Sequence, residues 1–126
     1  MAGTLVANTI NTDTGLFSTQ NAYQGIAKAW VNFQGGYSGT TAGAINKSFN
    51  VSSVTYVGTG TYTVNFSTAM VDGNYSAQAN SYFDGTSGGF NTITTVFGYT
   101  TTSCGIWAGY PSTLRNGTTV SVVIFD

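Results

Sequence analysis

The 126-residue sequence contains no histidine and no glutamate, and its single cysteine is Cys104. Histidine is the commonest general base, and Ser/His/Asp and Cys/His catalysis both depend on it. One cysteine without histidine also cannot supply the four ligands of a zinc site. The composition therefore predicts that the protein is not an enzyme and needs no metal or cofactor.

Aspartate supplies all four carboxylate side chains, at Asp13, Asp72, Asp84 and Asp126. Asp72 and Asp84 each precede a glycine, where aspartate typically hydrogen-bonds to the backbone of a turn. Asp84 with Asn80 and Asn91 offers oxygen ligands, but their spacing does not follow a known calcium loop. We therefore expect turn formation from these residues, and no calcium site.

Charged residues make up 6% of the chain, three basic and four acidic, against about 25% in typical soluble domains. Three cations are too few for nucleic-acid binding or for attraction to an anionic membrane. No apolar run is long enough to cross a membrane, and the first residues lack the pattern of a secretory signal, so we expect synthesis in the cytoplasm.

The low charge also bears on association, because it removes the repulsion that keeps monomers apart. A homo-oligomer is therefore expected. The alternative is a monomer kept soluble by its 22 threonines, 12 serines and 11 asparagines. Cys104 has no partner for an internal disulfide, and we expect it to be a small buried hydrophobic residue.

Hydrophobic residues alternate with polar ones in short runs separated by glycine, asparagine and aspartate. This pattern predicts an all-β protein, an antiparallel, jelly-roll-like β-sandwich of about seven to eight strands. We expect a core that includes Phe49, Val64, Phe66 and Val122. The expected strands cover residues 27–33, 45–53, 54–57, 61–67, 75–82, 93–97, 104–108 and 118–125.

Residues 1–25 differ from the sandwich domain expected at 26–126, because their hydrophobic residues are spaced irregularly. One interpretation is an extended arm that packs on a neighbouring subunit; the other is a first strand and loop of the same domain. The candidate contact residues are Leu5, Val6, Ile10, Leu16 and Phe17.

A second group of hydrophobic residues, all aromatic, gathers around the expected loops rather than on clear inward faces. Aromatic rings beside serine, glycine and asparagine are suited to recognition of sugars or proteins. The alternative is that several of these rings belong to the core or to a subunit interface. The group comprises Tyr82, Phe83, Phe90, Tyr99, Trp107 and Tyr110.

Three segments resemble a β-domain of bacteriophage virion proteins, found in tail-fibre C-terminal modules and capsid decoration proteins of marine and cyanobacterial phages. They are GIAKAWVNFQG at 25–35, the run from INKSFNVSS through GTGTYTVNF and AMVDGNY at 45–81, and VSVVIFD at 120–126. The resemblance covers residues 25–82 well, the last strand moderately and residues 83–117 loosely.

The resemblance implies a structural protein of the virion and supplies no catalytic residue. Because the segment before the domain is too short for a fibre shaft, we expect a capsid decoration or head-spike protein. The alternative is a tail-fibre tip that binds a host-surface glycan or protein. The implied partners are other copies of the chain, as a homotrimer, and virion proteins such as the major capsid protein.

The contact made by the arm can be tested by deletion, because burying one large apolar side chain completely stabilises a contact by about 1.5 to 3 kcal/mol. Deletion of residues 1–20 should leave a folded sandwich that no longer binds capsids stripped of the protein. Binding of the truncated and full-length chains to such capsids measures the effect. Equal binding would place the attachment surface on the sandwich, and unfolding of the truncated chain would make residues 1–20 part of the domain.

Overall fold

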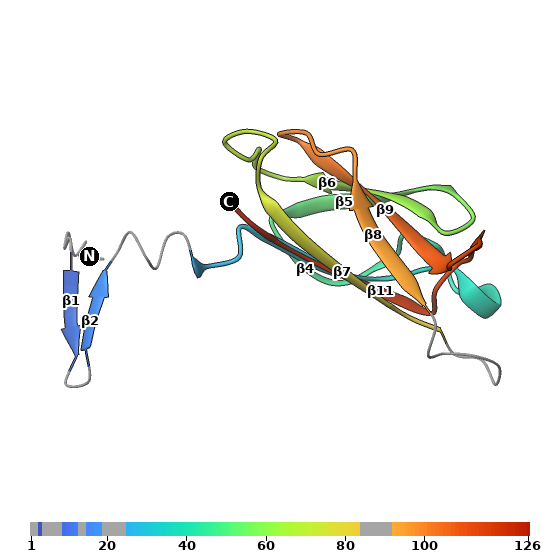
Figure 1. Ribbon diagram of the computed structural model, residues 1–126, viewed down its shortest axis with the longest axis horizontal. Coiled ribbons are helices and arrows are strands. Elements are labelled where there is room, and N and C mark those ends of the chain that lie inside the picture. Colours follow the sequence, from blue (N-terminus) through green and yellow to red (C-terminus); the bar gives the residue numbers. More distant parts are fainter. Residues whose placement is uncertain (1–2, 4–8, 13–14, 19–24, 84–91) are drawn as a thin grey trace.

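A computed structural model describes residues 3, 9–12, 15–18, 25–83 and 92–126. It is all-β, with eleven strands and a short 3-10 turn, η1, at Tyr37–Gly39 (Figure 1). The strands are β1 (Thr9–Thr12), β2 (Gly15–Ser18), β3 (Ala29–Gln34), β4 (Ile45–Phe49), β5 (Val51–Gly58), β6 (Thr61–Phe66), β7 (Ser76–Tyr82), β8 (Ile93–Phe97), β9 (Ser103–Tyr110), β10 (Thr113–Leu114) and β11 (Thr119–Phe125).

Nine of the strands form two antiparallel sheets that lie face to face (Figure 1). One sheet has the order β4-β3-β11-β7. In the other, β9 lies between β8 and β6, β5 pairs with β6, and β10 pairs with the last residues of β9. The predicted antiparallel β-sandwich is confirmed. The extra strand is β10, whose two residues are too few for any periodicity to appear in the sequence.

Alternate residues of the central strands fill one core between the sheets. In β3, Ala29, Val31 and Phe33 are buried, and in β6 the predicted inward residues Tyr62, Val64 and Phe66 are buried. The remaining buried hydrophobic residues are Val51, Met70, Tyr75, Phe83, Cys104, Ile106, Ala108, Val120, Val122 and Ile124. Cys104 is fully buried, as predicted.

Tyr62 anchors the middle of this core. Its ring meets Phe33 edge-on, with the ring centroids 5.1 Å apart, and its hydroxyl donates a 2.7 Å hydrogen bond to the Gly35 carbonyl of the opposite sheet. Burial raises the pKa of Tyr62 to about 12. This hydrogen bond links the two sheets inside a mainly apolar interior, and the neutral phenol is the form that the fold selects. A second polar link is the 2.6 Å hydrogen bond between the hydroxyls of Ser81 on β7 and Thr94 on β8.

Phe49 is the predicted core residue that the structure places outside. Its side chain is 53% exposed, whereas Val64, Phe66 and Val122 are buried. Phe49 lies opposite Trp30, which points away from the core because its neighbours Ala29 and Val31 point inward. The predicted strand at 45–53 is in fact divided, since β4 ends at Phe49 and β5 begins in the other sheet.

Asn50 makes this passage between the sheets. Its backbone has a φ of 53°, a left-handed conformation that asparagine tolerates better than most residues. Its side-chain amide donates to the carbonyls of Lys28 (3.0 Å) and Thr68 (3.1 Å) and accepts from the Thr68 backbone N–H (2.7 Å). Asn50 therefore joins the start of β3, the β4–β5 corner and the β6–β7 connection.

Strands β1 and β2 form a separate hairpin that pairs with neither sheet (Figure 1). Ile10 lies opposite Phe17 and Asn11 opposite Leu16 in its register. Leu5 and Val6, also predicted to contact a neighbouring subunit, lie outside the described residues. Contact between this segment and another subunit stays a prediction.

The Asn50 corner yields a stability prediction. Asn50→Gly keeps access to positive φ but removes the side-chain hydrogen bonds, and should lower the free energy of unfolding by about 1 to 3 kcal/mol. Asn50→Ala should lower it by roughly 1 kcal/mol more, because Cβ disfavours the left-handed conformation.

Urea unfolding of both variants measures these changes. Asn80→Ala is the control, since Asn80 is exposed and its side chain has no hydrogen-bond partner among the described residues. The control should stay within about 0.5 kcal/mol of the parent protein. Equal stability of the glycine and alanine variants would contradict the conformational role of Asn50.

Candidate functional site

The structure does not gather the predicted recognition aromatics into one site. Tyr82, at the end of β7, is 59% exposed, and Tyr99, in the β8–β9 turn, is 40% exposed. Trp107 and Tyr110 lie on β9, and Tyr99 lies beyond the other end of that strand. Phe90 lies outside the described residues.

Phe83 was predicted as a surface residue, and this is wrong. It is 8% exposed and stacks on Tyr110, with the ring centroids 5.7 Å apart. Phe83 comes directly after β7, where the chain leaves the four-stranded sheet, and its ring closes that end of the core. The alternative interpretation, that some of these aromatics belong to the core, is correct for Phe83.

Trp107 is the centre of an apolar surface on the outer face of the five-stranded sheet, the aromatic patch. Its ring stacks on Phe97 at a centroid distance of 4.2 Å and an angle of 27°. A Cβ on Gly105 would lie 2.5 Å from the Phe97 ring, so this glycine lets the ring lie against β9. Trp107 itself remains 45% exposed. The patch consists of Ile93, Phe97, Trp107 and Leu114.

A hollow of about 330 Å³ adjoins the aromatic patch. Trp107 and Leu114 line one part of it, and Tyr110 with the turn at 111–113 lines the rest. The Arg115 guanidinium lies 5.2 Å from the centre of the Tyr110 ring, within cation–π range. This end of β9 therefore presents aromatic and aliphatic surface with one cation at its border.

The outer face of the four-stranded sheet has a different chemistry. Its residues form rows across β3, β11 and β7: Trp30, Val123 and Gln78 make one row, and Asn32, Ser121 and Asn80 make the next. A third row runs from Gln34 through Thr119 to Tyr82. We call the first two rows, together with Asn46, the amide face.

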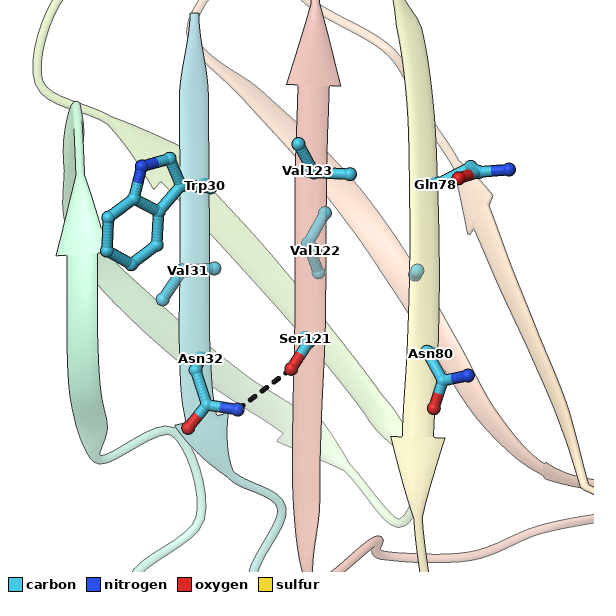
Figure 2. Close-up of a pocket in the computed structure, with 9 residues that line it drawn as sticks. Trp30, Val31, Asn32, Gln78, Asn80, Ser121, Val122 and Val123 are labelled. Atoms are coloured by element: carbon cyan, nitrogen blue, oxygen red, sulfur yellow. Dashed lines mark hydrogen bonds between the residues drawn. The ribbon is translucent and has the colours of Figure 1, made fainter. Parts of the chain in front are cut away.

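Hydrogen bonds order part of the amide face. Asn46 donates to the Asn32 side-chain oxygen at 2.8 Å. Asn32 in turn donates to the Ser121 hydroxyl at 2.8 Å, the dashed line in Figure 2. A shallow hollow of about 480 Å³ lies over the first two rows. The sequence does not indicate this site, because alternation marks these residues as outward but does not reveal that β3, β11 and β7 are neighbours.

A third hollow, of about 540 Å³, lies where the chain enters the sandwich. It is mainly apolar and is lined by Ile26, Ala27, Lys28, Phe49, Asn50 and Thr68. The exposure of Phe49 gives this end of the molecule its apolar character.

Asp72, Asp126 and Cys104 have structural surroundings rather than catalytic ones. Asp72 accepts a hydrogen bond from the Asn74 backbone N–H at 2.6 Å, which confirms its predicted turn, and Asp126 accepts from Val71 N–H at 3.0 Å. Burial raises the pKa of Cys104 to about 11, so its thiol stays protonated at neutral pH.

Metal ligands do not cluster within the described part of the chain: no three His, Cys, Asp or Glu residues there come together. Of the residues considered for calcium, Asn80 is exposed on β7, and Asp84 and Asn91 fall outside that part. Within the same residues, no helix is long and apolar enough to cross a membrane.

Comparisons with known proteins identify no relative of this chain. No family model, no curated protein and no solved structure matches the chain.

Proposed function

We propose that the protein is a non-enzymatic structural protein of a bacteriophage virion, a capsid decoration or head-spike protein displayed on the particle surface. It would assemble on the particle in the host cytoplasm. The resemblance of residues 25–82 to a virion β-domain supports the location. The observation that carries the architectural role is the aromatic patch, because it leaves large apolar side chains in water.

Exposed hydrophobic residues extend beyond the patch. Twelve large hydrophobic side chains among the described residues are exposed, including Val71 at 79% and Val57 at 62%. With a formal net charge of −1, the chain has little repulsion to keep copies apart. Extensive apolar exposure typically marks surfaces that contact other proteins.

The non-enzymatic part of the proposal rests on the chemistry of the side chains. Asp72 and Asp126 bind backbone N–H groups, and Cys104 is buried and protonated. The sequence also contains no histidine. These residues supply no nucleophile paired with a base.

The aromatic patch is proposed to pack against another copy of the chain in a homotrimer, while the N-terminal segment contacts the major capsid protein. Trp107 and Leu114 are 45% and 43% exposed, so each has about half of its apolar surface left to bury. Both project from a rigid sheet rather than from a long loop, which limits the conformational entropy lost on association.

A second candidate function is favoured by the amide face. A tail-fibre tip has to recognise a host-surface glycan or protein, and side-chain amides beside an exposed indole are suited to such recognition. The two functions differ in the number of copies on each particle, and both place the sandwich on the outside of the virion.

The assembly proposal is tested with the variant Trp107→Ser/Leu114→Ser. The parent chain should sediment as a trimer, and the variant should shift toward the monomer because the contact loses its apolar side chains. Leu114→Ser alone should give a smaller shift, and circular dichroism checks that each variant keeps its β-structure.

The control is Val57→Ser/Val71→Ser, which removes two apolar side chains outside the patch that are even more exposed than Trp107 and Leu114. It should sediment like the parent. A monomeric parent chain at high concentration, or the same shift in control and patch variants, would contradict assembly through the aromatic patch.

A further inference from the structure

The amide face presents hydrogen-bonding groups that the described part of the chain does not use. Within the described residues, the side-chain amides of Gln78 and Asn80 have no hydrogen-bond partner, and both side chains are exposed. They lie at alternate positions of β7 and so point to the same side of the sheet. Each amide offers one acceptor and two donors to a ligand.

Neighbouring groups add oriented donors and acceptors. The chain of hydrogen bonds from Asn46 through Asn32 to Ser121 holds the Asn32 amide in one orientation. Ser121 lies directly between Asn32 and Asn80 in the register of the sheet. The polar row therefore crosses two strand spacings, about 9.5 Å.

Trp30 supplies a flat apolar surface beside this polar row. Figure 2 looks onto the outer face of the sheet and shows the Trp30 ring beside β3 with its broad side in view. Trp30 is half-buried, which fixes the ring against the sheet. Val123, its neighbour on β11, continues the apolar strip toward Gln78.

Charge is absent from the lining of this hollow. Its side chains come from tryptophan, valine, alanine, asparagine, glutamine and serine. The exposed Lys47 lies opposite Asn32 on β4, outside this lining. A phosphate, sulfate or carboxylate group seated over the lining residues would find no cation among them to offset its lost hydration. A purely apolar ligand would instead cover the amides of Gln78 and Asn80 without offering them a hydrogen bond.

We infer that the amide face is a binding site for a neutral oligosaccharide. The hydroxyl groups of a sugar both donate and accept, as the side-chain amides do, and the C–H face of a sugar ring packs on an indole. The half-buried Trp30 and the hydrogen-bonded Asn32 are ordered before the ligand arrives, which lowers the entropy lost on binding. This inference names the ligand class for the second candidate function and rests on it for the role of the amide face, but its test uses the isolated chain and does not depend on the virion location.

The test uses neutral hexasaccharides of glucose, mannose, galactose or N-acetylglucosamine, and oligogalacturonate as an anionic probe. Trp107→Phe serves as the parent, so that tryptophan fluorescence reports on Trp30 alone. At least one neutral saccharide should change this fluorescence in a saturable way, and oligogalacturonate should not.

Substitutions then locate the site in that parent. Gln78→Ala and Asn80→Ala should each weaken binding by about 2- to 12-fold, the range expected for loss of one neutral hydrogen bond. They should leave the fold intact, because both side chains are exposed without partners. Asn65→Ala is the amide control on the other sheet, where Asn65 bonds to Ser53 and Thr55, and it should not change affinity.

Trp30→Ala should abolish detectable binding in a calorimetric titration, which does not depend on fluorescence. Three results would overturn the inference: no binding of any neutral hexasaccharide at millimolar concentration, tighter binding of oligogalacturonate, or unchanged affinity in both the Gln78 and Asn80 variants. A change in sedimentation caused by Trp30→Ala would show that another copy of the chain covers the amide face, and this would overturn the inference as well.

Discussion

The structure depends on one constraint: every core strand has to place alternate side chains in a single interior between two sheets. Val31 and Phe33 of one sheet meet Tyr62 and Val64 of the other, and the Tyr62 hydroxyl is satisfied by the Gly35 carbonyl across the interface. Successive side chains of a strand point to opposite faces of its sheet, so when one face is buried in the core the side chains of the other face take no part in it. At Asn50 the chain passes between the sheets and the alternation is reset, so that Phe49 is exposed whereas Val51, two residues later, is buried.

The outer faces of the two sheets differ in chemistry. Stacked Phe97 and Trp107 give the five-stranded sheet an apolar patch, whereas Asn32 and Asn80 give the four-stranded sheet an ordered polar surface. A protein with so few charges depends on such surfaces for specific contacts. The proposed roles follow this division: assembly through the apolar face and recognition through the polar one.

The sequence predicted the β-sandwich and its central strands because alternation in β3, β6 and β11 is strong and directly reports burial. It failed at Phe49, where a left-handed Asn50 ends β4 and no periodic signal marks the corner. It also assigned Phe83 to the surface, since a residue beyond a strand end has no alternation to follow. The amide face requires knowledge of strand order, which brings Trp30, Gln78 and Ser121 together from distant parts of the chain.

Quantitative mass spectrometry of purified, washed phage particles decides whether the sandwich is displayed on a virion as an architectural subunit, as we propose. We expect the chain to be present in a fixed, simple ratio to the major capsid protein. A copy number matching the tail fibres would contradict the capsid role and leave the tip function. Absence of the chain from the particles would contradict the account as a whole.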